Sequence, residues 1–185
     1  RLIVMSVLVT LWGVRLTLNF AKKGAYSIKF WEGEEDYRWI VLRRNPYLNK
    51  RWKWALFDLF FISIYQNALV LAITLPLLAS MDSTVAFNVL DVVIAAILFG
   101  FILLETLADK QQMAFQTTKY KLLNEGKTLK ELPSPYNKGF ITTGLWSRSR
   151  HPNYFSEQSI WVVLYLFCFV IFMGVLFVVF FFFFN

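Results

Sequence analysis

Residues 144–157 read GLWSRSRHPNYFSE, and the stretch that follows, residues 159–184, contains no charged residue. An apolar run of this length can cross the hydrocarbon core of a bilayer as a helix. Pro152 suits the first turn of such a helix, because its missing N–H is not needed there and its φ is already helical. The sequence therefore predicts a polar, cationic segment at the start of a membrane helix. Residues 144–157 are called the signature segment below.

The signature segment supplies six polar side chains around the predicted helix start: Arg148, Arg150, His151, Asn153, Tyr154 and Glu157. The unpaired N–H groups and the positive dipole end of a helix bind anions, phosphates above all. A basic collar that meets lipid headgroups is the alternative for the arginines. That collar does not account for the asparagine, the tyrosine and the glutamate.

The rest of the chain is also rich in apolar runs. The hydrophobic fraction is 57% and the aromatic fraction 19%, well above the values of soluble proteins. Together with residues 159–184, runs at about 2–20, 55–79 and 85–104 predict membrane spans. We therefore expect an all-α fold, a multi-pass integral membrane helix bundle in the lipid bilayer that forms a single membrane domain over residues 1–185.

The net charge of +7 is concentrated in two loops. Residues 21–53 hold nine bases and four acids, and residues 110–151 hold eight Lys or Arg and two acids. Basic loops stay on the cytoplasmic side, where soluble nucleotide cofactors are found, so both loops are predicted to face that side. Nucleic acid is not an expected partner of so apolar a chain. One cysteine and one histidine do not build a metal site by themselves.

Several polar residues lie within or beside the predicted spans. Arg15 lies near the end of the first span, where it either snorkels to the interface or serves a site. Glu105, Asp109, Gln112 and Gln116 follow the third span at steps of four, three and four, which predicts one stripe on a continuing helix. This polar stripe is either a solvated face, a partner for the arginines of the signature segment, or an acceptor for ribose hydroxyls.

The second span carries its own polar residues. Asp58, Ile62 and Tyr65 share one face if the span is a regular α-helix. Polar side chains at bilayer depth usually face a bundle interior or a cavity. This face is therefore predicted either to bond a neighbouring helix or to form the wall of a pocket.

The signature segment resembles the motif LW-x-x-SRHPNY-x-GE of the steroid 5-alpha-reductase-like membrane proteins. ETLADKQQMAF at 105–115 is similar to the family's E-T-x-A-D-x-Q segment, and WGVRL and EDYRW are similar to two motifs near its start. Ser156 stands where the family usually has glycine. Family members also continue beyond the point where this chain stops, so the chain is expected to be part of a longer protein.

The resemblance implies a membrane oxidoreductase that uses NADPH to reduce a C=C bond in a lipid or sterol-like enone. It implies nucleotide contacts from Arg15, Asp109, Arg148, Arg150, His151 and Asn153, and a catalytic, orienting role for Tyr154 and Glu157. Tyr65 is a candidate proton donor. The resemblance also implies the endoplasmic reticulum membrane, with the mitochondrial inner membrane as the alternative. Since the chain has no Gly-x-Gly-x-x-Gly motif, a dinucleotide would bind among membrane helices and their loops.

Two other functions stay open. Isoprenylcysteine-type membrane methyltransferases also use an RHPxY motif, with S-adenosylmethionine, but that motif explains neither Asn153 nor Glu157. A non-catalytic family member would instead serve as a structural or lipid-binding subunit of a membrane complex, with the last aromatic helix packed against another subunit. A binding measurement would separate the three functions. NADPH binding would favour the reductase, S-adenosylmethionine binding the methyltransferase, and binding of neither the structural subunit.

Overall fold

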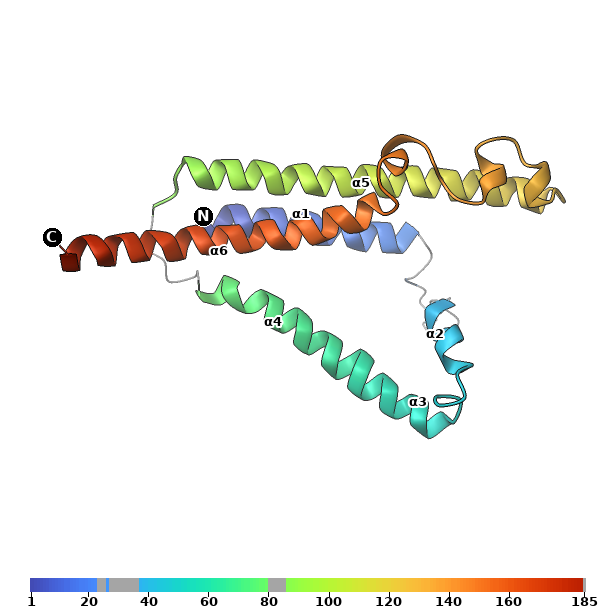
Figure 1. Ribbon diagram of the computed structural model, residues 1–185, viewed down its shortest axis with the longest axis horizontal. Coiled ribbons are helices and arrows are strands. Elements are labelled where there is room, and N and C mark those ends of the chain that lie inside the picture. Colours follow the sequence, from blue (N-terminus) through green and yellow to red (C-terminus); the bar gives the residue numbers. More distant parts are fainter. Residues whose placement is uncertain (23–25, 27–36, 80–85, 185) are drawn as a thin grey trace. The chain divides into compact units, whose positions relative to one another are not determined.

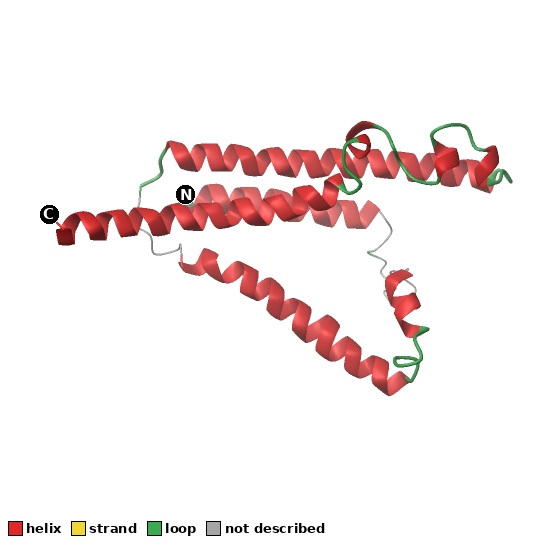
Figure 2. Ribbon diagram, in the orientation of Figure 1, coloured by secondary structure: helices red, strands yellow, loops and turns green. Residues whose placement is uncertain are grey.

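The computed structural model describes residues 1–22, 26, 37–79 and 86–184. Within those residues every regular element is a helix, as Figure 2 shows. Three helical stretches are long and apolar enough to cross a membrane, namely Leu2–Lys22, Arg51–Ala72 and Val89–Asn124. The chain is therefore an all-α integral membrane protein, which confirms the fold class predicted from the hydropathy of the sequence.

The chain divides into two compact units. Unit 1 consists of Arg1–Arg15 and Val85–Asn185, and unit 2 consists of Leu16–Thr84. The signature segment and the polar stripe both belong to unit 1. The single membrane domain expected for residues 1–185 stays a prediction.

Unit 1 is built on three helices that lie side by side (Figure 1): the first part of α1 (Leu2–Lys22), α5 (Val89–Asn124) and α6 (Pro152–Phe184). Each presents an apolar face to the others at steps of three or four residues. Leu8 of α1, Leu98 of α5 and Phe167 of α6 are buried on these faces. Many other large apolar side chains of these helices are exposed, as expected of helices that face lipid.

Two arginines reach α5 through their side chains, Arg1 from directly before α1 and Arg15 from within it. The Arg1 side chain donates from Nε and Nη2 to the two carboxylate oxygens of Asp91, at 2.6 and 2.7 Å. Arg15 donates to the backbone oxygen of Glu105 at 3.2 Å, and both contacts join residues 90 positions apart in the chain. The constant offset means that α1 and α5 run parallel. The two arginines stand fourteen positions apart, about 21 Å along a helix.

The start of α5 is fixed by its cap. Asn88 accepts hydrogen bonds from the N–H groups of Leu90 and Asp91 through its side-chain oxygen, and the Asp91 carboxylate accepts from the Asn88 N–H at 2.9 Å. This reciprocal capping box satisfies donors that a helix start leaves unpaired. Asp91 therefore serves both the cap and Arg1, and its side chain is fully buried.

α5 continues well past the predicted span, without a break, to Asn124. This confirms the continuing helix expected for the polar stripe. The connection to α6 contains three short 3₁₀ turns, η3 (Leu129–Glu131), η4 (Tyr136–Lys138) and η5 (Gly144–Ser147). The Tyr136 ring stacks on Phe115 of α5 with ring centroids 5.1 Å apart. α6 begins at Pro152, as predicted, and its backbone stays helical to Phe184.

Unit 2 contains α2 (Tyr37–Arg43), α3 (Arg51–Phe57), a π-helix η2 (Asp58–Tyr65) and α4 (Gln66–Ala79). The prediction of one α-helical face for Asp58, Ile62 and Tyr65 is wrong, because a π-helix closes its turns on the fifth residue and so changes which side chains align. The Phe61 ring instead stacks on that of Tyr65, at a centroid distance of 5.5 Å.

Candidate functional site

The polar stripe of α5 meets α1 at a cluster of charged side chains. Arg15 forms an ion pair with Glu105, with 2.6 Å between Nη1 and Oε1, and a second, very close one with Asp109. The Trp12 indole N–H donates to Glu105 Oε2 at 3.0 Å. Glu105 is buried, and its carboxylate contacts two donors, the Trp12 indole and the Arg15 guanidinium. The polar stripe is therefore not a solvated face at Glu105.

The signature segment joins the same cluster through Asn153. The Asn153 side-chain N–H donates to Asp109 Oδ1 at 3.2 Å, across 44 residues of chain. Asn153 lies in the first turn of α6, so α1, α5 and α6 converge on one carboxylate. We call Trp12, Arg15, Glu105, Asp109 and Asn153 the Arg15 cluster. It holds one formal positive charge and two formal negative charges.

The loop before α6 is seated on α5 by two hydrogen bonds. The Leu145 N–H donates to Gln111 Oε1 at 3.0 Å, and the Trp146 indole N–H donates to the Ala108 backbone oxygen at 3.1 Å. Gly144 makes this close approach possible. A Cβ on Gly144 would lie 2.6 Å from Gln111 Oε1, and its φ of +61° is one that residues with side chains rarely adopt. The glycine therefore helps to deliver Asn153 to Asp109.

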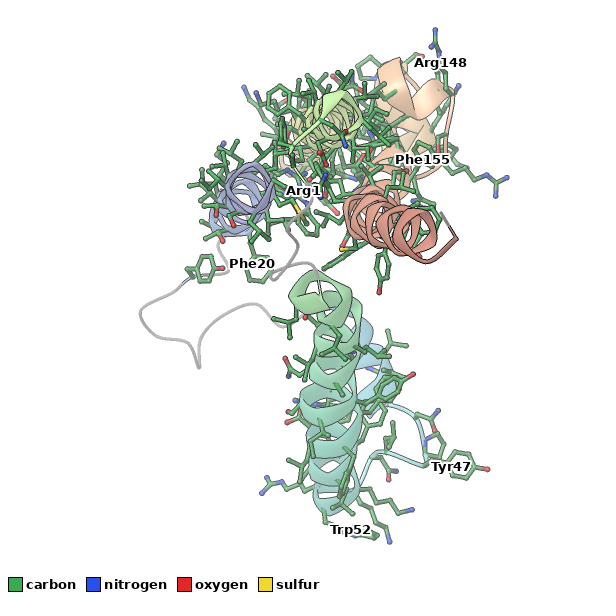
Figure 3. All side chains as sticks on the ribbon, turned by 90° about the vertical axis from the view of Figure 1, so that its left-hand side faces the viewer. Arg1, Phe20, Tyr47, Trp52, Arg148 and Phe155 are labelled. Atoms are coloured by element: carbon green, nitrogen blue, oxygen red, sulfur yellow. The ribbon has the colours of Figure 1, made fainter. Side chains whose placement is uncertain are left out.

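The basic residues of the signature segment lie outside this cluster. Arg148, labelled in Figure 3, is exposed, as are Arg150 and His151. The His151 ring lies edge-on to Trp146 with a centroid distance of 6.5 Å. These three side chains thus stand on the loop that leads into α6, close in sequence to Asn153 but directed to the surface. Their predicted contacts with a nucleotide stay predictions.

The two residues predicted to orient the reacting groups take different faces of α6. Glu157 follows Asn153 by four residues, which places both on one side of the helix, and Glu157 is half-buried. Tyr154 is 61% exposed. The structure therefore brings Arg15, Asp109 and Asn153 together, keeps Glu157 on their side of α6, and sets Tyr154 apart.

Further along the polar stripe, Gln112 and Gln116 each have a buried amide oxygen. Neither oxygen has a hydrogen-bond partner among the residues that the structure describes. Buried acceptors are normally paired, so these two extend the polar surface of α5 beyond Asp109.

The site contains two residues that the sequence did not single out. Trp12 supplies a hydrogen bond to Glu105, and Gln111 seats the loop at Gly144. A signal for Trp12 existed, since it precedes Arg15 by three residues and therefore shares its helix face. Gln111 stands beside the polar stripe rather than on it, and only the folded loop reveals its role.

Comparisons with known proteins found one family and one relative of this chain. The model of the family described as "Protein of unknown function (DUF1295)" matches residues 1–182. An uncharacterised protein of Schizosaccharomyces pombe is 35% identical over 176 residues, which cover 90% of this chain and 48% of that protein. The chain thus spans about half the length of this relative. No solved structure matches the chain.

Proposed function

The chain belongs to the family of proteins of unknown function DUF1295, and within it we propose that this protein is a membrane oxidoreductase of the steroid 5-alpha-reductase type. The proposed reaction is NADPH-dependent reduction of a C=C bond in a lipid or sterol-like enone. The observation that carries the proposal is the convergence of Arg15, Asp109 and Asn153 from three helices. Two carboxylates share Arg15 as their cation, and the more exposed one also accepts from Asn153, so acceptor oxygens from α5 are concentrated where the three helices meet.

The residues of the Arg15 cluster fit the ribose part of such a cofactor. A carboxylate is an acceptor with several lone pairs, and ribose hydroxyls are donors. The Asp109 side chain is 15% exposed, while that of Glu105 is 4% exposed. Asp109 is therefore the acid of the pair that a ligand can reach, and Arg15 and Asn153 hold it in place.

The phosphate part fits the exposed arginines of the signature segment. Arg148 and Arg150 are exposed on the loop that enters α6, where the first N–H groups of the helix lack intrahelical partners. An arginine guanidinium can donate two parallel hydrogen bonds to the oxygens of one phosphate. The extra phosphate of NADPH therefore favours arginine partners. His151, between Arg150 and the first helical residue, adds a further donor.

NADPH, when bound, supplies the hydride; the chain supplies binding and orientation. Glu157 lies one turn beyond Asn153 on the same face, so it is suited to orient the nucleotide or the reacting ring. Tyr154 lies on the exposed part of α6, from which it would serve a ligand that reaches around that helix. The apolar spans give a lipid or sterol-like substrate a route through the bilayer, and we propose the endoplasmic reticulum membrane as the location.

Nucleotide binding by the purified full-length protein tests the proposal. NADPH binding is expected in the unmodified protein and should weaken at least about tenfold in Asn153→Ala, since the substitution frees Asp109 from α6. Asn137→Ala is the matched control, because Asn137 is exposed in the preceding loop. It should bind as the unmodified protein does.

The same assay separates the rival functions. Binding of S-adenosylmethionine in place of NADPH would favour a methyltransferase. Binding of neither nucleotide would favour a structural or lipid-binding subunit of a membrane complex. If NADPH binds and Asn153→Ala has no effect, the Arg15 cluster is not the nucleotide site.

A further inference from the structure

Residues 37–57 of unit 2 combine many positive charges with exposed aromatic rings. This stretch of sequence contains no acidic residue. Its described basic side chains are those of Arg43, Arg44, Lys50, Arg51 and Lys53. Tyr47 is 79% exposed and Trp52 is 61% exposed, and Figure 3 labels both. We call residues 43–54 the basic aromatic turn.

The turn is held together by contacts between its cations and its rings. The Arg43 guanidinium, at the end of α2, lies over the Trp54 ring of α3 at 4.6 Å from the ring centroid. The Lys53 amine lies 5.8 Å from the centroid of Trp52. Between the helices, Asn45 accepts a hydrogen bond from the Tyr47 N–H through its side chain at 3.0 Å. Charge and ring are thus presented on one structured turn.

The turn leads directly into a membrane-spanning stretch. The candidate span begins at Arg51 and runs to Ala72, and none of the residues of its most apolar window is buried within the protein. Large side chains such as Leu56, Leu59 and Phe60 are about half exposed. Since this stretch is long and apolar enough to cross a membrane, the basic aromatic turn at its start is expected at the level of the headgroups.

We propose that the basic aromatic turn is a docking surface for anionic phospholipid headgroups. Positive charges attract the anionic leaflet, and the sequence predicts that this loop faces the cytoplasm, where anionic lipids are concentrated. Amphipathic rings such as those of Tyr47 and Trp52 settle between headgroups and acyl chains. Within residues 37–57 themselves no carboxylate is present to pair with these bases; the four acids of the loop stand before this stretch, at positions 32–36. The surface acts independently of the proposed nucleotide site, which lies in unit 1.

The test uses the full-length protein in nanodiscs that contain phosphatidylserine and phosphatidylcholine. Lipid that stays bound after transfer to detergent is identified by native mass spectrometry. The unmodified protein should retain phosphatidylserine in excess. Arg44→Gln/Lys50→Gln/Arg51→Gln should lower that excess by about tenfold or more, because each base contributes near an anionic surface.

A matched variant carries the same change elsewhere. Lys127→Gln/Lys130→Gln/Lys138→Gln removes three exposed bases from the other basic loop and should leave the excess of phosphatidylserine intact. Arg44→Lys/Arg51→Lys, which preserves the charge, should also leave it intact, and this variant controls for misfolding. An equal loss in the Lys127 variant would overturn the proposal.

The last arm distinguishes lipid from free phosphate. Inorganic phosphate at millimolar concentration should not displace the bound phosphatidylserine, because the rings hold the lipid as well as the cations do. Complete displacement would show that the turn binds phosphate as such and would overturn the docking of lipid. Neither result depends on whether NADPH binds to unit 1.

Discussion

Arg1, directly before α1, and Arg15, within α1, both reach carboxylates of α5, and the two sites differ in the number of carboxylates that meet each arginine. Arg1 meets one carboxylate, Asp91, and the side chains of this pair are 6% and 0% exposed. Arg15 meets two carboxylates, Glu105 and Asp109, and the second of these is 15% exposed. The Arg1 pair therefore matches one guanidinium with one fully buried carboxylate, whereas the Arg15 cluster sets one guanidinium against two carboxylates, one of which is partly exposed.

This difference separates a stabilising role, which we assign to the Arg1 pair, from a binding role, which we propose for the Arg15 cluster. A closed pair of buried charges is costly to break, because the remaining charge stays buried without a partner. A cluster with an excess carboxylate keeps acceptor capacity that a donor from outside can use. The Arg1 pair is thus suited to fix α1 against α5, and the Arg15 cluster is the site proposed to bind the nucleotide.

The largest expected effect is on stability, at the closed pair. Asp91→Asn leaves the charge of Arg1 buried without its counter-ion, which should cost about 3–5 kcal/mol in the free energy of unfolding. The midpoint of thermal unfolding in detergent should fall by roughly 6–20 °C. NADPH binding by the molecules that remain folded should change little.

A paired replacement sharpens this result. Arg1→Met/Asp91→Leu removes both charges and fills the same space with apolar atoms, so most of the lost stability should return. If the double variant is as unstable as Asp91→Asn, the capping of α5 by Asp91 matters more than its pairing with Arg1.

The next effect reverses the pattern at the open cluster. In Asp109→Asn, Arg15 keeps Glu105 as a counter-ion, so the free energy of unfolding should fall by only about 1 kcal/mol. NADPH binding should weaken at least tenfold, or about 1.4 kcal/mol, because the carboxylate proposed to accept ribose hydroxyls is gone. Titration of the purified protein with NADPH measures the loss.

The comparison between the two variants carries the interpretation. Both make the same chemical change, from aspartate to asparagine, on the same helix. If Asp109→Asn lowers stability as much as Asp91→Asn does and leaves binding unchanged, the Arg15 cluster is a second structural clamp.

A smaller effect is expected at the loop that delivers Asn153. Gly144→Ala and Gly126→Ala both place an alanine at positive φ, of +61° and +89°, which costs about 1–2 kcal/mol. Only Gly144→Ala also pushes the Gln111 side chain away from the Leu145 N–H. It should therefore lose roughly 1 kcal/mol more and weaken NADPH binding, whereas Gly126→Ala should not weaken it. Unfolding midpoints and titrations of both variants measure the difference.

The smallest expected effect is a dependence of local stability on pH at Glu131, which lies outside both the Arg1 pair and the Arg15 cluster. The Thr128 N–H donates to Glu131 Oε2 at 2.9 Å, and this bond holds the pKa of Glu131 below its ordinary value of 4.5. The stabilisation is present above the ordinary value and is lost as the pH falls through the lowered pKa. Hydrogen exchange at Thr128 should quicken in that window. In Glu131→Gln this dependence should vanish, and a persisting one would assign it to another group.

Much of the fold could be predicted from hydropathy. The spans follow from the length of the apolar runs. The start of α6 at Pro152 follows from the chemistry of proline, and the continuation of α5 under the polar stripe follows from the spacing of its polar residues. The π-helix from Asp58 to Tyr65 could not be predicted, because no proline or glycine marks it and the apolar content of a span is the same in either form.

Part of the candidate site could also be predicted from the hydropathy of the sequence. Asp109 and Asn153 stand out because polar residues beside an apolar span are costly without a partner. Their mutual hydrogen bond depends on how the loop from 125 to 151 folds back, which local spacing does not encode. The exposure of Tyr154 is likewise set by the rotation of α6 about its axis, which its nearly uniform apolar sequence leaves open, and that of Arg148 by the fold of the loop before α6.

Arg1 and Arg15 are as far apart in sequence as their partners Asp91 and Glu105 on α5. This equal spacing couples the length of α1 to that of α5. Inserting one residue between positions 91 and 105 would turn Asp91 by about 100° relative to Glu105 and lift it by about 1.5 Å. Only a matching insertion in α1 would restore both contacts. Changes of length in these two helices should therefore occur jointly during evolution, because a change in only one of them would break one of the two contacts.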